Sequence, residues 1–181
     1  MNLNNCTEEE LWKYVATKLA QNNVDVVLVG GAVVSIYSQG AYKSGDLDFV
    51  LYDFSRKKLD KVLIEDLGFR KEGRFYKNDD CPHLFLEFAS FPASIGDDYN
   101  ITPAEVEHDG QIIKIFSPTD CVRDRLASYA YFDAPECLDQ AVLVAGRHQI
   151  NFEKVESWCK SEGIMDKYQD FIEELKSKTR A

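Results

Sequence analysis

The sequence predicts an α/β (α+β) protein with an all-helical C-terminal extension, and three observations support this fold class. Hydrophobic residues make up 45% of the 181 residues, which is enough to bury a core. Short runs rich in β-branched residues alternate with helically spaced segments up to about residue 115. From residue 116 onward, helix N-terminal signals follow one another without a strand between them. We therefore expect an α/β domain over residues 1–115 and a helical subdomain over 116–181 that packs on it.

The first part of the chain contains the strongest helix and strand signals. Thr7 and Glu10 form the capping box of a helix that runs to about residue 22. Residues 24–29 (VDVVLV) form a nearly continuous apolar run, as expected of a strand covered on both faces. The other expected strands are 46–52, 83–88 and 111–116, with a strand or hairpin over 69–76, and the other expected helices are 32–38 and 54–66.

The C-terminal third shows repeated helix starts. Ser117 is an expected N-cap and is followed by a proline at the first helical position. Asp133 and Pro135 repeat this arrangement before the next helix, and Asn151 caps a third helix around residues 155–160. A last helix is expected over 165–176.

Composition and charge limit the function classes. The formal net charge is −10, so long-range repulsion makes duplex DNA and anionic membranes poor partners. Residues 54–77 nevertheless hold eight basic and four acidic residues, a local charge of +4, which either meets a polyanion or forms a solvated helix face. No apolar run approaches the ~20 residues that span a bilayer. Since the N-terminus also lacks a secretory signal pattern, we expect a cytoplasmic protein.

The five cysteines and three histidines are scattered along the chain, and no two cysteines form a CxxC pair. This spacing argues against both a disulfide framework and a tetrahedral zinc site. It predicts five reduced cysteines.

Gly30 and Gly31 directly follow the strand expected over 24–29. Paired glycines let backbone N–H groups approach a ligand closely, and the helix N-terminus that follows favours negative charge. The segment lacks the third glycine of a dinucleotide fingerprint, and the chain has no Gly-Lys-Ser/Thr P-loop. By itself, the pair does not identify a ligand.

Three acidic residues lie within apolar strands. Period-two geometry places the carboxylates of Asp46 and Asp48 on one face of the sheet, where they repel each other unless divalent cations bridge them. Glu87 lies inside HLFLEF, where a carboxylate is costly unless it is paired or coordinated. The alternatives are solvated or capping aspartates, and a Glu87 that pairs with a lysine or faces solvent.

The order of these features resembles the signature of the DNA polymerase beta-like nucleotidyltransferase superfamily, over roughly residues 24–90. Gly30-Gly31, fourteen further residues, Asp46-Leu47-Asp48 and then Glu87 carry the likeness. Residues 117–126 (SPTDCVRDRL), followed by Gln140-Ala141, resemble a bacterial branch near the AbiEii-type toxins. The resemblance implies a small mixed sheet flanked by helices of the nucleotidyltransferase type.

The resemblance also implies a two-metal enzyme that moves a nucleoside monophosphate from an NTP to a hydroxyl group. Asp46, Asp48 and Glu87 would be the catalytic residues and would hold Mg²⁺ or Mn²⁺. Gly30 and Gly31 would cradle the triphosphate. The other candidate nucleotide-binding residues are Ser35, Lys43, Ser44 and Arg125.

Each of these additional residues has an ordinary alternative. Lys43 and Ser44 either neutralise pyrophosphate or are plain loop residues. Arg125 either clamps a phosphate or belongs to an interdomain salt bridge involving Asp124.

The implied partners are the NTP, an acceptor that is RNA (tRNA-like) or protein, and a cognate antitoxin if the chain is part of a toxin–antitoxin pair. Membranes and duplex DNA are not expected partners. The competing hypothesis is a catalytically silent nucleotidyltransferase-like module that binds a nucleotide or a partner protein.

Overall fold

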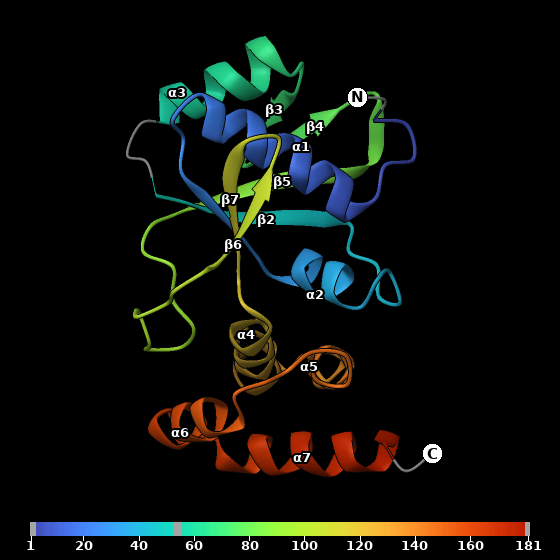
Figure 1. Ribbon diagram of the computed structural model, residues 1–181, viewed down its shortest axis with the longest axis vertical. Helices are drawn as coiled ribbons and strands as arrows, with labels where there is room; N and C mark the ends of the chain where they lie inside the picture. The colour runs from blue at the N-terminus through green and yellow to red at the C-terminus, as the bar shows by residue number, and fades with distance from the viewer. Residues whose placement is uncertain (1–2, 53–55, 180–181) are drawn as a thin grey trace.

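The computed structural model describes residues 3–52 and 56–179, which form one seven-stranded sheet and seven α-helices (Figure 1). The strands are β1 (Val26–Val29), β2 (Asp46–Leu51), β3 (Arg70–Glu72), β4 (Phe75–Asn78), β5 (Cys81–Ser90), β6 (Ala104–His108) and β7 (Gln111–Ile115). The helices are α1 (Glu8–Gln21), α2 (Gly31–Tyr37), α3 (Arg56–Asp60), α4 (Pro118–Tyr131), α5 (Glu136–Ala145), α6 (Phe152–Glu162) and α7 (Met165–Thr179), with a π-helical turn over Lys61–Asp66 after α3. Helices and strands alternate as far as β7 and helices alone follow, which confirms the predicted fold class.

The sheet is mixed, with the order β3-β4-β5-β2-β1-β7-β6. β1 pairs antiparallel with β2 and parallel with β7, while β2 pairs parallel with β5. The central strands are apolar and covered on both faces, because α1 and α2 both contact β1 and β2. Edge strands β3 and β6 carry charged residues instead, as exposed edges usually do.

Helix α1 begins as the sequence predicts. The Thr7 side chain accepts a hydrogen bond from the Glu10 N–H, and the Glu10 carboxylate accepts one from the Thr7 N–H at 2.8 Å. Leu11, Val15 and Leu19 are fully buried on one face of the helix. This apolar stripe packs α1 on the sheet near β7 and β1.

The structure adds detail that the sequence patterns did not contain. Residues 69–76 form the β3–β4 hairpin, and β5 is longer than the expected strand at both ends. Strand β6 was not predicted, because its acidic residues alternate with half-buried ones at an edge and give no apolar run. The helix expected over 54–66 is present as α3 and the π-helical turn, and residues 54 and 55 lie outside the described residues.

The C-terminal helices start at two of the three predicted caps. Ser117 accepts a hydrogen bond from the Asp120 N–H, and Asn151 accepts one from the Lys154 N–H. The predicted cap at Asp133 was wrong. Asp133 has a φ of +50°, and α5 instead begins after Pro135, which makes no side-chain cap.

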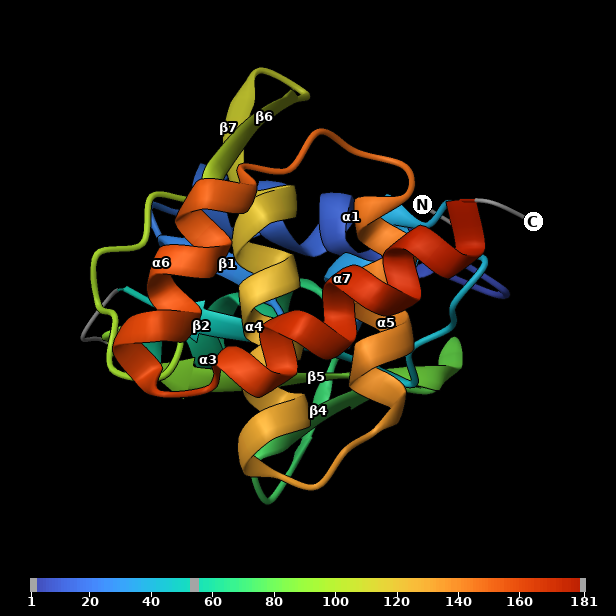
Figure 2. The ribbon, with the colours of Figure 1, turned by 90° about the horizontal axis from the view of Figure 1, so that it is seen from below.

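Helices α4–α7 form a layer that meets the rest of the molecule largely through α2 (Figures 1 and 2). The His148 ring donates from Nε2 to the Tyr37 carbonyl over 2.8 Å, and Trp158 Nε1 donates to the Ile95 carbonyl over 3.1 Å. The layer therefore abuts the end of α2, just beyond the glycine turn. Within the described ranges, no helix has the length and apolar character to cross a bilayer.

Candidate functional site

The register between β2 and β5 places carboxylates from two strands side by side. The strands run parallel, with Asp46 opposite Phe85 and Asp48 opposite Glu87. All three acids are half-buried, whereas Leu47 between the aspartates is fully buried on the opposite face. The two aspartates and the glutamate thus share one face at adjacent strands.

The glycine turn lies directly against these carboxylates. Gly30 has a φ of +75°, and a Cβ at this position would stand 2.6 Å from Oδ2 of Asp48. A Cβ at Gly31 would stand 2.9 Å from the hydroxyl oxygen of Ser44. Only glycine allows the backbone to pass this close to the acids, because any side chain would fill the space beside them.

The acids interact electrostatically. Burial, together with repulsion from Asp46 and Glu87, raises the pKa of Asp48 to about 7. Such repulsion requires the three charges to lie close together. Asp48 therefore keeps its proton to a higher pH than an ordinary aspartate does, and a cation bound among the acids would drive that proton off.

Ser44 connects the acids to the start of α1. Its hydroxyl donates a hydrogen bond to Oδ1 of Asp46 over 2.9 Å, and its backbone N–H donates to Oε1 of Glu8 over 2.8 Å. The buried Glu8 carboxylate thereby fixes the loop that precedes β2. Ser44 is thus placed to orient Asp46, a contact that neither alternative from the sequence, a pyrophosphate ligand or a plain loop residue, included.

Two arginines lie near the carboxylates. Arg74, from the β3–β4 turn, approaches Oε1 of Glu87 with its Nε at 3.3 Å. Arg125 on α4 is largely buried and pairs with Oδ2 of Asp124 at 2.5 Å, and its charge partly offsets the rise in the pKa of Asp48. Arg125 thus lies within electrostatic range of Asp48, and its ion pair with Asp124 joins adjacent residues of α4 rather than two domains, so it is not the interdomain salt bridge that the sequence offered as an alternative.

Ser35 and Lys43 do not join this group. Both line a cavity of about 270 Å³ beside the start of α1, and Nζ of Lys43 is 3.9 Å from the Glu8 carboxylate. Ser35 is buried, and its carbonyl accepts a hydrogen bond from the Ser38 hydroxyl. Their contacts are with α1 and the end of α2 rather than with the three acids.

Two residues near the site were missed from the sequence. The hydroxyl oxygen of Tyr42 would be 3.4 Å from a Cβ at Gly31, and Gln140 accepts a long hydrogen bond from Arg125 at 3.4 Å. Both line a cavity of about 550 Å³ between the loop before β2 and the helices α5 and α7. An aromatic residue in the loop between the glycine pair and the aspartates was the only sequence signal for Tyr42.

Four basic residues of the strip over residues 54–77 form ion pairs with acids. Arg70 pairs with Glu72 and Asp79, and Lys71 pairs with Asp60. Lys77 pairs with Glu72, and Arg74 with Glu87. This pattern fits the solvated alternative better than a continuous surface for a polyanion.

The three acids offer only oxygen ligands, which is the donor set that Mg²⁺ and Mn²⁺ prefer. In the described part of the chain, the groups with three potential ligand atoms within 4.8 Å of one another do not include these acids. The ligand oxygens of the three acids therefore do not all lie within 4.8 Å of one another. Their chemistry and their place beside the glycine turn fit a divalent cation.

The fold resembles that of a known protein. The crystal structure of an antigenic nucleotidyltransferase-like protein from Paracoccidioides brasiliensis superimposes with a TM-score of 0.57 at 20% identity, covering 79% of this chain and 76% of that chain. The chain therefore has a nucleotidyltransferase-like fold.

Two structures of the antibiotic-resistance factor ANT(2″)-Ia are also similar, one of them in complex with adenylyl-2″-tobramycin. The solution structure has a TM-score of 0.46 at 16% identity and covers 92% of this chain and 89% of that one. The complex has a TM-score of 0.47 at 15% identity and covers 91% and 94%. These scores are too low to support a conclusion. No protein-family model matches the chain, and no curated protein matches it in sequence.

Proposed function

We propose that the chain is a metal-dependent nucleotidyltransferase, which moves a nucleoside monophosphate from an NTP to a hydroxyl group of an acceptor. The observation that carries the proposal is the placement of Asp46, Asp48 and Glu87 on one face beside Gly30, where burial and mutual repulsion raise the pKa of Asp48 to about 7. A bound cation would relieve the repulsion between these carboxylates and favour their ionised forms.

Asp46, Asp48 and Glu87 would hold Mg²⁺ or Mn²⁺. The bound ions would neutralise phosphate charge and favour the deprotonated acceptor hydroxyl. Ser44 holds Asp46 by its hydrogen bond, and Arg74 reaches Glu87. These two contacts hold the carboxylates of Asp46 and Glu87 in place. Asp48 lies between them, and it is the acid whose protonation would change when a cation binds.

The backbone at Gly30 and Gly31 would meet the triphosphate, since the absence of side chains leaves room beside Asp48. Arg125 would add positive charge from the α4 side. The cavity bordered by Tyr42 and Gln140 lies next to this position and is large enough for part of a nucleotide or acceptor.

The acceptor is proposed to be a structured RNA, tRNA-like, or a protein. Because Arg70, Lys71 and Lys77 are held in ion pairs, the strip over residues 54–77 attracts a long polyanion less than its sequence alone suggests. This favours an acceptor that enters through a shaped cavity.

Transfer of label tests the proposal. The protein is incubated with each [α-³²P]NTP and Mg²⁺, together with a deproteinised RNA pool or a protein extract, and incorporation is measured. We expect Mg²⁺-dependent incorporation into one pool that is lost in Asp46→Asn and Asp48→Asn. Asp25→Asn is the matched control, because Asp25 is an exposed acid paired with Lys114 at 2.8 Å and should be dispensable.

Equal incorporation by the Asp46→Asn/Asp48→Asn double variant would refute the enzyme. Calorimetric binding of an NTP with Mg²⁺, without incorporation into any pool, would instead support the silent binding module.

We further propose the toxin role as a narrower form of this activity. Expression in a bacterial host should then arrest growth, and Asp46→Asn should relieve the arrest. Harmless expression of an active enzyme would exclude the toxin role and leave nucleotidyl transfer standing.

A further inference from the structure

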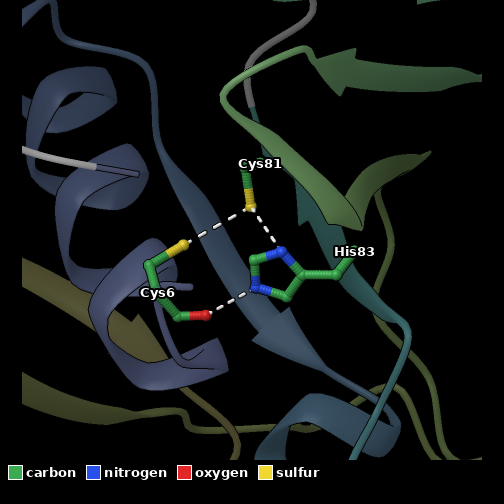
Figure 3. Close-up of side chains that lie close together, drawn as sticks. All are labelled: Cys6, Cys81 and His83. Carbon is green, nitrogen blue, oxygen red and sulfur yellow. Dashed lines mark hydrogen bonds between the residues drawn. The ribbon is translucent and has the colours of Figure 1, made fainter. Parts of the chain in front are cut away.

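A second group of potential metal ligands lies where the N-terminal segment meets β5 (Figure 3). The sulfur atoms of Cys6 and Cys81 are 3.4 Å apart, and the Cys81 sulfur is 4.0 Å from Nδ1 of His83. These three ligand atoms all lie within 4.8 Å of one another. The scattered spacing in the sequence argued against such a cluster, but the fold joins residues that are 75 positions apart.

The orientation of His83 suits a ligand. Its Nε2 lies 2.8 Å from the carbonyl oxygen of Cys6, and a carbonyl can only accept a hydrogen bond, so Nε2 carries the proton. In the neutral ring, Nδ1 then presents its lone pair toward the two sulfurs. Ligating histidines usually donate their other ring N–H to a carbonyl or carboxylate in this way.

The distances match those of a tetrahedral thiophilic cation. Zn–S bonds of about 2.3 Å and Zn–N bonds of about 2.0–2.1 Å place two sulfurs about 3.8 Å apart and a sulfur about 3.6 Å from a nitrogen. The observed separations of 3.4 and 4.0 Å need only small side-chain adjustments to reach these values. We propose that Cys6, Cys81 and His83 form a binding site for a thiophilic divalent cation such as Zn²⁺, distinct from the carboxylates of β2 and β5.

A fourth ligand position is open to solvent. Cys6 and Cys81 are buried, but the His83 residue is exposed. A cavity of about 330 Å³ borders Cys6 and His83 and also Glu8 and Ser44. Water from this cavity completes a tetrahedral site without rearrangement of the backbone.

Loading changes the protonation of the cluster. Each Cys–sulfur bond to the cation replaces an S–H bond, and the proton passes to solvent. Binding therefore releases up to two protons and needs no oxidant or reductant.

The site also links two parts of the molecule. Cys6 precedes α1, whereas Cys81 and His83 begin β5. Two residues after Cys6, Glu8 holds the Ser44 backbone. A bound cation would therefore fix the N-terminal segment that supports the loop before β2, and it should raise the melting temperature.

Zinc binding by the full chain provides the test. The protein is purified with a phosphine reductant, stripped with chelator, reloaded with Zn²⁺ and analysed by elemental mass spectrometry. We expect about one zinc per chain, with a gain in melting temperature. Co²⁺ loading should produce a thiolate-to-cobalt charge-transfer band, which depends on sulfur ligands.

His83→Ala is the first variant, because its exposed ring can be removed without opening the core. Losing a ligand should weaken zinc binding by more than the roughly 10–100-fold that follows loss of an outer hydrogen-bond partner. His108→Ala is the matched control, since His108 bonds Thr17 on another face and should leave binding unchanged. Cys81→Ser should abolish the cobalt band, and Cys159→Ser, which alters another buried cysteine, should not.

Two results would overturn the proposal. One is the absence of stoichiometric zinc in the reloaded wild type, and the other is equal affinity in His83→Ala. Thiol counting that shows a Cys6–Cys81 disulfide after peroxide treatment, with no zinc bound in the reduced form, would assign a redox pair instead. None of these outcomes bears on incorporation of label from NTP, which depends on the other set of residues.

Discussion

Two clusters of buried and half-buried charge are built in opposite ways. In the C-terminal layer, the buried Arg123 pairs with Asp120 at 2.8 Å, also pairs with Asp98, and lies over the Trp158 ring. Burial would raise the pKa of Asp98, but hydrogen bonds from the Asn100 N–H and Arg123 outweigh it, so the pKa is lowered. These acids are satisfied by fixed partners and hold helices together.

The acids of β2 and β5 are left in repulsion. The pKa of Asp48 is raised to about 7 by burial and by its acidic neighbours. The fold pairs its buried acids in one layer, whereas in the other it leaves Asp48 beside two further carboxylates, of which Glu87 contacts the exposed Arg74 and Asp46 the Ser44 hydroxyl. The paired charges around Arg123 therefore stabilise the fold, whereas the repelling carboxylates of β2 and β5 are suited to bind a cation.

The largest expected effect comes from breaking the paired cluster. Arg123→Ala should lower the free energy of unfolding by about 3–5 kcal/mol, because it leaves buried Asp120 without one of its cationic partners. Urea denaturation measures this change. The exposed i,i+4 pair of Lys13 with Glu9 is the control, and Lys13→Ala should cost no more than about 0.5 kcal/mol. A loss below about 1 kcal/mol for Arg123→Ala would contradict the structural role of the paired cluster.

In the repelling cluster of Asp46, Asp48 and Glu87, adding a proton should stabilise the fold. The pKa of Asp48 is raised above 3.8 in the folded protein, so the folded state binds a proton more tightly than the unfolded chain. The metal-free wild type should therefore gain stability as the pH falls from 8 through 7 toward 4.

Asp48→Asn should remove this dependence and stabilise the protein at pH 8 by at most about 4 kcal/mol. Urea denaturation in chelator at pH 5, 6, 7 and 8 checks both statements. Destabilisation by Asp48→Asn at pH 8 would show that Asp48 has a fixed cationic partner after all.

The glycine turn offers a smaller test of the same contrast. Gly30→Ala places a Cβ 2.6 Å from Asp48, whereas Gly110→Ala, also at a positive φ, meets no atom within 4 Å. Both should cost about 1 kcal/mol or more from backbone strain. Only Gly30→Ala should also abolish label transfer. Equal label transfer by the two variants would show that the glycine turn is not part of the active site.

The smallest effect is expected at Arg74, whose side chain is exposed although it contacts Glu87. Arg74→Ala should change the free energy of unfolding by less than about 0.5 kcal/mol. It should raise the pKa of Asp48 further, since Glu87 loses its cation. A shift of the pH-dependent stability profile to higher pH would confirm this; an unchanged profile would show that Arg74 does not influence the acids.

The sequence predicted what depends on local pattern. The capping box of α1, the apolar strands and the period-two spacing of Asp46 and Asp48 carry their geometry within a few residues. The nucleotidyltransferase-like fold and the mixed sheet were implied by the family resemblance and agree with the structure.

What the sequence did not predict depends on contacts between distant segments. The edge strand β6 lacks an apolar run, and Tyr42 gains its position only when the loop folds back on Gly31. Ser35 and Lys43 follow the glycine pair in sequence but turn toward α1. The Cys6–Cys81–His83 cluster was hidden because its members belong to segments that only the sheet and α1 bring together.

Manganese binding tests the central claim most directly, because Mn²⁺ can be counted by electron paramagnetic resonance in the absence of any nucleotide or acceptor. The account predicts saturable Mn²⁺ binding by the wild type that strengthens as the pH rises through about 7, is lost in Asp48→Asn and is retained in Asp25→Asn. Mn²⁺ binding that is unchanged in Asp48→Asn, or that shows no dependence on pH in this range, would contradict it.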